Sequence, residues 1–397
     1  MSQRLEFVQL AEQAGVNFRQ LCRRFRISAK TGYKWRRRYA TGGVAALADR
    51  SRRPKRSPQT CAGERAAEVV ALRQEHPSWG GRKLRRRLQD LQKKAVPAAS
   101  TCTAILRRAA LLATGPQAAP GPCQRFERPQ PNDLWQLDFK GHFATQAGPR
   151  CHPLTMLDDH SRFNLLLTPL TEQTGAAVEP ALRAVFAQYG LPNQLLCDNG
   201  PPWGASDPVC PHTSLSVALL RLGVQVIHGR PYHPQTQGKE ERFHRTLHAD
   251  LIARHTWRDL AHCAAEFPRF RQIYNCERPH DSLEGATPVS RYRPSPRSLP
   301  ATLPAIEYPA GTTVRVLPRN GWLRFRAQTW YVGRAFGGQP IGLRPSAQAD
   351  GLWEVCFDLH RLGSLDLRLP PQAPSADRSI YSSLPPGDAS SRPPFPA

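Results

Sequence analysis

The stretch PYHPQTQGKEERFHRTL, from Pro231 to Leu247, joins a loop rich in Pro, Gln and Gly to a helix with acids in its first turn. At 3.6 residues per turn, Phe243 and Leu247 lie on one side of that helix and predict its buried face. Another side gathers one acid and three basic side chains, namely Glu241, His244, Arg245 and His248. A carboxylate beside cations at a helix start suits a site for a metal ion and a phosphate.

The same stretch also has a plainer interpretation. Acidic residues are favoured in the first turn of any helix because of the helix dipole, so the motif alone decides nothing. Glu240 is the rival for a ligand role, but its i+3 and i+7 neighbours are Phe243 and Leu247. Periodicity therefore turns Glu240 toward the apolar side and favours Glu241 as the site residue.

Two further acids stand in or just after predicted strands. Asp138 lies inside the strand-like run Leu134–Phe143, and Asp198 follows a short apolar run, just before the turn signal Asn199-Gly200. A buried acid is costly unless it is paired or bound to a metal. Oxygen ligands are what Mg²⁺ prefers, so these two acids and a helical Glu can converge on divalent cations.

These motifs resemble those of bacterial insertion-sequence transposases with a retroviral-integrase-type core. Asp138 in LDFKG, Asp198 in DNG and Glu241 in the quoted stretch match the three acids of that group. LDDHSRF (157–163) and YNCERPHDSL (274–283) are similar to further signatures of it. The ordered set covers about half of the chain and is far more specific than any single motif.

The chain departs from the resemblance at two points. Forty-two residues separate Asp198 from Glu241, more than in compact members, and PPWGASDPVCPH (201–212) is the expected extra loop. Many relatives carry Lys or Arg seven residues after the catalytic Glu, where this chain has His248. Lys239 and Arg245 are the expected compensating contacts to DNA.

The resemblance implies a ribonuclease-H-like core in which Asp138, Asp198 and Glu241 are catalytic and hold two Mg²⁺ ions, or Mn²⁺, about 3.5–4 Å apart. It implies an enzyme that binds the ends of a mobile element, cleaves them, and joins the 3′ ends to target DNA by transesterification. The expected partners are double-stranded DNA, as terminal repeats and target, and at least one more copy of the chain, because two ends are joined. No Tyr or Ser nucleophile is then required.

The charge of the chain is concentrated at one end. Of a net charge of +24, residues 1–112 carry +19 and the other 285 residues only +5. A strongly basic third is typical of polyanion binding, and we find no long apolar run or amphipathic anchor that would favour a membrane instead. Ten unclustered cysteines, with no C-x-x-C pair, exclude a zinc ribbon and fit a reducing compartment. With no apolar leader or span, the expected location is the bacterial cytoplasm, at the nucleoid.

The basic third predicts two helical DNA-binding modules, 1–48 and 63–112, joined by a basic linker, 49–62. In the first, Asn17 and Ser28 are expected to cap two helices in a helix-turn-helix arrangement, with the second helix in the major groove. In the second, HPSWGGRKL (76–84) resembles the winged-type helix-turn-helix of the same transposases. A bundle with a solvated basic face is the alternative. The predicted DNA contacts are Lys30, Lys34, Arg36, Arg37, Arg38, Arg82, Lys83, Lys239, Arg245 and His248.

After a Pro- and Ala-rich linker (113–131), residues 132–295 predict the catalytic core as a mixed α/β sheet with flanking helices. The expected strands are 134–143, 152–157, 163–170, 194–197 and 224–227, and the expected helices are 175–189, 214–222 and the one bearing Glu241. Alternating residues in 305–370 predict four or five antiparallel strands, enough for a small β-barrel that binds DNA or a neighbouring subunit. Residues 371–397 are expected to be disordered.

Several polar residues receive structural expectations. Asp158 and Asp159 follow a strand and are expected to shape the turn after it. Asn275, Arg278 and His280 are expected to cap and pack, and His233 to be a hydrogen-bonded loop residue. Two other functions stay open at this point: a catalytically silent DNA-binding regulator, which predicts loss of one acid, and a nuclease of the same fold that cuts without joining.

Overall fold

The computed structural model describes residues 3–49, 63–112, 127–204, 207, 209–228, 238–303, 305–370 and 378–381. It separates into two compact units, 1–60 and 61–397. His233 and its loop lie outside the described residues, as do most of the two predicted linkers. None of the described helices is long and apolar enough to cross a membrane.

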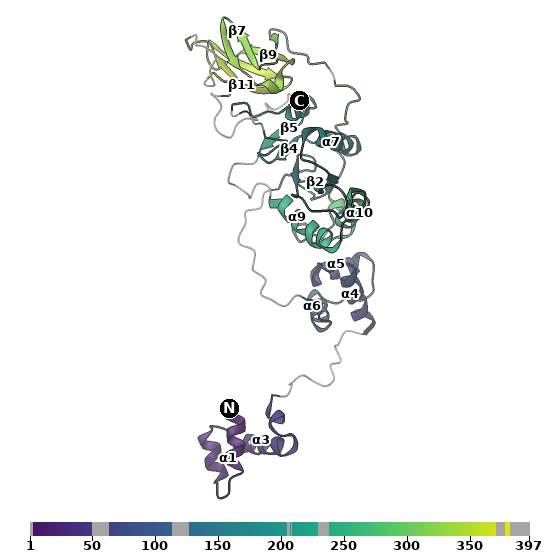
Figure 1. The fold of residues 1–397 in the computed structure, drawn as a ribbon, viewed down its shortest axis with the longest axis vertical. Coiled ribbons are helices and arrows are strands. Elements are labelled where there is room, and N and C mark those ends of the chain that lie inside the picture. Colours follow the sequence, from purple (N-terminus) through teal and green to yellow (C-terminus); the bar gives the residue numbers. More distant parts are fainter. Residues whose placement is uncertain are drawn as a thin grey trace. The chain divides into compact units, whose positions relative to one another are not determined.

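The first unit is a three-helix module (Figure 1, purple), built from α1 (Gln3–Ala11), α2 (Phe18–Arg24) and α3 (Ala29–Gly42). The predicted caps are confirmed, since Asn17 accepts from the Gln20 amide and Ser28 from the Thr31 amide. Gly32 lets α3 approach its neighbours, because a Cβ there would stand 2.8 Å from Cys22 Sγ and 2.9 Å from Phe7 Cζ. This close approach fits the helix-turn-helix arrangement that the sequence predicts.

The second module contains α4 (Gly63–Glu75), α5 (Gly81–Asp90) and α6 (Ala99–Arg108) around Trp79, Leu84 and Leu106. Within residues 63–112 the structure has helices and no strand, so the wing suggested by the resemblance is not present there. Two ion pairs join α5 to the catalytic core, Lys83 with Asp281 and Arg87 with Glu277.

The core is a five-stranded mixed sheet in the order β3-β2-β1-β4-β5. Antiparallel pairing joins β1 to β2 and β2 to β3, whereas β1, β4 and β5 run parallel. The strands are β1 (Leu134–Phe139), β2 (His152–Asp158), β3 (Asn164–Leu170), β4 (Gln194–Cys197) and β5 (Gln225–His228). The first strand ends four residues earlier than predicted, before Gly141, whose φ of +87° does not continue a strand.

Helices cover both faces of this sheet (Figure 1). On one face α7 (Gly175–Tyr189) and α8 (Ser214–Arg221) pack around Trp135, Leu195 and Phe186. On the other, α9 (Gly238–Asp250) and α10 (Leu260–Gln272) pack around Phe243, Leu157 and Phe267. Helix α9 is thereby held against β1 and β2, which places its first turn beside Asp138.

The C-terminal module corrects the prediction of a closed barrel. Its strands form a four-stranded sheet, β11-β10-β9-β6, and a separate β7-β8 hairpin, both antiparallel. The two sheets bury Leu323, Trp330, Val355 and Phe357 between them, so apolar packing joins them where a barrel would use hydrogen bonds. The strands are β6 (Thr313–Val316), β7 (Trp322–Phe325), β8 (Gln328–Tyr331), β9 (Pro340–Pro345), β10 (Leu352–Phe357) and β11 (His360–Asp366).

The predicted disorder of 371–397 is wrong for residues 378–381. Ile380 is fully buried, and its amide donates to the Tyr331 carbonyl at 3.2 Å. The Tyr331 amide in turn donates to the Arg378 carbonyl at 2.9 Å. The Pro- and Ser-rich composition predicted disorder, whereas the single apolar side chain of Ile380 packs into the module.

Candidate active site

Two of the three predicted acids lie at the ends of neighbouring parallel strands. The register that pairs Gln136 with Leu196 continues to Asp138 in β1 and to Asp198, directly after β4. Burial, the charge of Asp198 and the charge of Glu241 together raise the pKa of Asp138 to about 6. Asp198 and Glu241 therefore both lie within electrostatic reach of Asp138.

Asp198 sits at the start of the turn that the sequence predicted. Its Oδ1 accepts from the Gly200 amide at 3.2 Å, and its carbonyl accepts from His228 Nδ1 at 2.9 Å. Burial raises the pKa of this carboxyl, while His228 and the Gly200 amide lower it. His228, at the end of β5, thus orients the backbone of Asp198, a contact that no sequence signal indicated.

Glu240 and Glu241 take opposite environments at the start of α9. Glu240 is fully buried, as its apolar i+3 and i+7 neighbours predicted, whereas Glu241 is exposed. Burial and the nearby Asp138 raise the pKa of Glu240 well above its usual range, which favours the neutral carboxyl. Only Glu241 of the two presents an oxygen to solvent beside Asp138.

His244 is where the helix-face prediction was wrong. It is only 9% exposed and faces the sheet, because it follows Glu240 by four residues as well as Glu241 by three. Its Nε2 lies 2.8 Å from Thr155 Oγ1, and its Nδ1 lies 3.9 Å from Asp138 Oδ2. Burial lowers the pKa of His244 to about 3, so the ring is neutral and does not add a cation to the exposed face.

The Thr155 hydroxyl contacts Asp138, Glu240 and His244. Its hydroxyl lies 3.0 Å from the Asp138 carbonyl oxygen and 3.1 Å from Glu240 Oε2. We call Thr155, Glu240 and His244 the buried polar cluster. It fixes α9 against the strand pair β1–β2, immediately behind Asp138. No sequence signal indicated it, because Thr155 is more than 80 residues from both partners.

Of the basic residues around the acids, one binds an acidic partner and others are exposed to solvent. Lys239 donates to the Asp159 carboxylate and, at 3.2 Å, to its carbonyl, so it holds the turn after β2. Arg245 and His248 are exposed on α9. Lys140, two residues after Asp138, lowers the pKa of that carboxyl and is a nearby cation that the sequence analysis overlooked.

The turn residues play structural roles, in agreement with expectation. Asp158 is buried and accepts from the Asn132 amide at 2.8 Å and the Ser161 amide at 2.7 Å. Asp159 accepts from Gln136 Nε2 at 2.7 Å. Both carboxylates organise the loop that follows β2.

The YNCERPHDSL residues also pack as expected. The Asn275 side chain makes two hydrogen bonds to the backbone of Asn164. Its Oδ1 accepts from the Asn164 amide at 2.8 Å, and its Nδ2 donates to the Asn164 carbonyl at 3.0 Å. Arg278 lies 3.6 Å from Asp250 and over the Tyr274 ring. His280 is buried against Tyr274, and burial lowers its pKa to about 3.

The predicted DNA contacts of the two N-terminal modules differ in availability. Lys30, Lys34, Arg36, Arg37 and Arg38 lie on α3, and none pairs with an acid among the described residues; all but the half-buried Arg38 are exposed. On α5 Arg82 is exposed, but Lys83 is bound to Asp281 at 2.6 Å. Lys83 therefore joins its module to the core.

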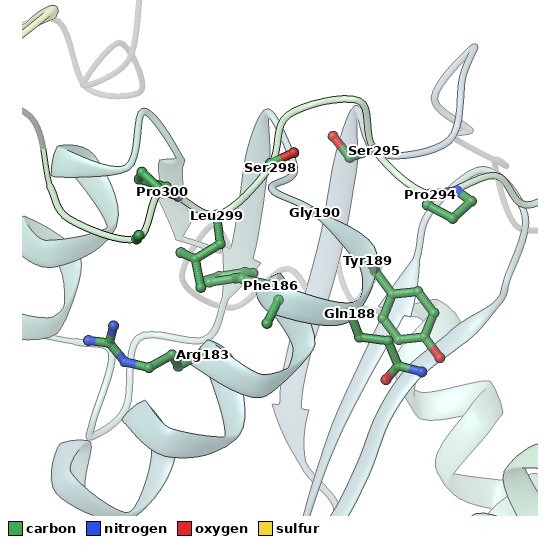
Figure 2. A pocket seen from close by; sticks show the side chains of 12 residues that line it. Arg183, Phe186, Gln188, Tyr189, Gly190, Pro294, Ser295, Ser298, Leu299 and Pro300 are labelled. Carbon is green, nitrogen blue, oxygen red and sulfur yellow. The ribbon is translucent and has the colours of Figure 1, made fainter.

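In the part of the chain that the structure describes, no group of three or more His, Cys, Asp or Glu side chains is arranged to hold a metal ion. A hollow of about 400 Å³ lies elsewhere, where the end of α7 meets residues 294–301 (Figure 2). Phe186, Tyr189 and Leu299 line it, and none of the three acids does.

Comparison with protein families agrees with the order of these parts. Residues 128–234 and 222–288 each match an integrase core domain, and residues 312–371 match the C-terminal domain of the IS481 family of transposases. The chain is related to insertion-sequence transposases with an integrase-type core. Its N-terminal part matches a helix-turn-helix domain at 3–55 and a homeodomain-like domain at 31–106.

The individual proteins that match this transposase-like chain cover only part of it. An uncharacterised protein of insertion element IS407 from Burkholderia multivorans is 26% identical over 160 residues, 40% of this chain and 54% of the relative. The Gag-Pro-Pol polyprotein of Mason-Pfizer monkey virus is 33% identical over 117 residues, 30% of this chain and 6% of the polyprotein. The chain thus spans about half of the first relative and a small part of the second.

Among solved structures, the catalytic core domain of BIV integrase is 23% identical, with a TM-score of 0.31 over 40% of this chain and 92% of that one. A chain of the simian T-cell lymphotropic virus intasome, solved with a regulatory subunit of PP2A, is 16% identical. It covers 71% of this chain and 94% of its own length, with a TM-score of 0.37.

Proposed function

We propose that this protein is a DNA transposase that binds the ends of a mobile element, cleaves them, and joins the 3′ ends to target DNA. The observation that carries the proposal is that Asp198 and Glu241 both act electrostatically on Asp138 within a region that matches the integrase core domain. The exposed cations of α3 and the helix-turn-helix match support recognition of duplex DNA. Because the proposed substrate is DNA, we infer that the protein acts at the bacterial nucleoid.

The three acids suit divalent cations. Each offers carboxylate oxygens, the ligands that Mg²⁺ and Mn²⁺ prefer, and repulsion from Asp198 and Glu241 adds to burial in raising the pKa of Asp138. A bound cation would remove that repulsion, so the residues fit the group. We infer that Asp138, Asp198 and Glu241 hold two ions, which when bound supply activation of the attacking oxygen and neutralisation of the charge on the leaving oxygen.

The chain's own residues supply positioning. His228 orients the backbone of Asp198, and the buried polar cluster holds Asp138 and α9 in place. Arg245 and His248 would bind phosphates along the exposed side of α9, next to Glu241. Because phosphoryl transfer needs little covalent chemistry from the protein, such positioning and charge are the main contributions expected of it.

Two other functions remain testable. A silent DNA-binding regulator would keep the fold and lose an acid, yet all three acids are present. A nuclease of the same fold would cut without joining, and the two DNA-binding modules favour the transposase, which must recognise its own ends. Joining two ends further implies at least two copies of the chain in the active complex.

The adjacent glutamates offer a matched test. A labelled duplex with the element's own end is incubated with Mg²⁺ and wild type, Glu241→Gln or Glu240→Gln. We expect Glu241→Gln to abolish both cleavage and joining, while Glu240→Gln, whose amide can still bond to Thr155, retains them. Cleavage without joining by the wild type would favour the nuclease, and binding without either step would favour the regulator. Loss of activity in Glu240→Gln alone would overturn the assignment of Glu241.

A further inference from the structure

The extra length between Asp198 and Glu241 begins as a tight loop that packs on the core. The Trp203 amide donates to the Gly200 carbonyl at 3.0 Å, and the Trp203 ring is buried. That ring lies 6.0 Å from the ring of Phe139, the residue after Asp138. The first part of the loop therefore links the backbone after Asp198 to the strand that carries Asp138.

The second part of the loop packs on the C-terminal module. Asp207 accepts a hydrogen bond from the Tyr331 hydroxyl. Cys210 Sγ lies 3.6 Å from the Tyr381 hydroxyl, and the His212 ring meets the Phe336 ring edge-on at 5.2 Å. These three contacts join one loop of the catalytic core to β8, to the turn after it, and to the packed segment 378–381.

The same junction continues as shared apolar core. Cys210, Val217 and Leu220 belong to one buried cluster with the C-terminal module's Phe336 and Phe357. At its edge, His360 Nε2 lies 3.1 Å from the Leu220 carbonyl oxygen. Shared burial of this kind is typical of parts that stay together, since separation would expose the apolar side chains of both.

The segment 378–381 closes the junction. The Tyr381 hydroxyl donates to the Val332 carbonyl at 2.9 Å, and the Tyr381 ring lies 6.1 Å from the His212 ring. The backbone of segment 378–381 is hydrogen-bonded to Tyr331 of β8 through the Arg378 carbonyl and the Ile380 amide. Tyr381 therefore contacts both sides of the junction, the loop of the core and the C-terminal module.

We propose that the C-terminal module is a positioning part of the catalytic site, which holds the loop after Asp198 through the Asp207–Tyr331 and Cys210–Tyr381 contacts. Trp203 fixes the near end of this loop and the C-terminal module its far end, so the direction of Asp198 depends on both. Asp207, Tyr331 and Tyr381 are positioning residues. The effect on catalysis rests on the proposed function, whereas the docking itself does not.

Docking is tested by the reactivity of Cys210, which is 1% exposed. The full-length protein is treated with a thiol reagent, and labelling is read peptide by peptide in wild type, Tyr331→Phe and Tyr381→Ala. We expect Cys210 to react about tenfold faster in each variant, the factor that 1.4 kcal/mol of lost docking energy gives. Cys263, a fully buried residue of α10, reports global unfolding and should stay protected.

Tyr308→Phe is the matched control. The Tyr308 hydroxyl lies 2.8 Å from the Pro340 carbonyl oxygen and 3.3 Å from that of Cys356, and it accepts from the Asp358 amide at 3.2 Å. This variant therefore loses phenol contacts inside the C-terminal module and none of these is to the core. Its Cys210 should react as slowly as in wild type. Equal protection of Cys210 in wild type and Tyr381→Ala would overturn the docking.

Positioning is tested by the Mg²⁺ concentration at half-maximal cleavage of an end duplex. We expect Tyr331→Phe to need several-fold more Mg²⁺, and Tyr308→Phe to need no more than wild type. An exposed Cys210 with an unchanged Mg²⁺ requirement would overturn the positioning role. If the wild type does not cleave with Mg²⁺, the proposed function fails, and labelling of Cys210 still supports or overturns the docking by itself.

Discussion

Thr155→Val is the substitution that tests the buried polar cluster most directly. Thr155 is fully buried in β2, and Val keeps its shape and its preference for strands while removing the hydroxyl. That hydroxyl lies within 3.1 Å of Glu240 Oε2, 3.0 Å of the Asp138 carbonyl oxygen and 2.8 Å of His244 Nε2. No other atom in the described part of the chain is hydrogen-bonded to all three.

The cost follows from what the substitution leaves behind. Glu240, which keeps its bond from the Leu157 amide, and His244 would both lose a hydrogen-bond partner, and losing a partner costs a buried polar group about 1–3 kcal/mol. Because these two side chains already lie 3.6 Å apart, they can partly pair with each other. We therefore expect a loss of about 2–4 kcal/mol in the free energy of unfolding. For a core of this size that lowers Tm by roughly 5–12 °C.

The assay is thermal unfolding of the full chain followed by circular dichroism, with Thr168→Val as control. Thr168 lies in the neighbouring strand β3, and its hydroxyl has no hydrogen-bond partner in the described part of the chain. The control should unfold within about 1 °C of wild type, in line with the small effect of most peripheral substitutions. A Thr155→Val variant as stable as the control would refute the role given to the cluster.

Three further predictions concern charge and close packing. The folded pKa of Asp138, about 6 against 3.8 for the free side chain, means that its contribution to stability falls as pH rises from about 4 to 6 without cations. Mg²⁺ should therefore raise Tm more at pH 7.5 than at pH 5, and Asp138→Asn should abolish the difference. Gly81→Ala should destabilise the second module by about 1–3 kcal/mol, because its Cβ would meet the α6 backbone. Gly80→Ala, with open space around its Cβ, should cost much less when both are compared by proteolysis. His248→Lys should tighten binding of the end duplex and steepen its salt dependence by about one phosphate contact, unlike Ala249→Lys on a different side of α9; equal effects would contradict the phosphate role of His248.

Where local signals were complete, the sequence predicted elements to the residue. Helix α7 (Gly175–Tyr189) matches its predicted range because Thr174 caps it by accepting from the Ala177 amide, and Gly190 ends it at a φ of +77°. The strand β4 (Gln194–Cys197) also matches, since it lies between such turn residues. Both boundaries are set by neighbours in the chain.

The misses involve partners distant in sequence. Periodicity placed His244 with Glu241, yet position 244 adjoins both glutamates on a helix, and only the hydroxyl of Thr155 on a distant strand decides its direction. Lys239, predicted to contact DNA, also binds Asp159, 80 positions away, and no local signal indicated this ion pair. A sequence shows how many cations a segment has, and not which of them already have an acid beside them.

The same limit applies to the charge of the N-terminal third. Its +19 predicts nucleic-acid binding, but the total counts Lys83 and Arg87, which α5 uses against Asp281 and Glu277 of the core. Charges neutralised by acids of the protein release no counterions from DNA and add nothing to its affinity. The cations of α3 pair with no acid in the described chain, so they carry more of the expected DNA affinity than their number suggests. In the second module, by contrast, part of the positive charge is neutralised by the ion pairs that attach it to the catalytic core.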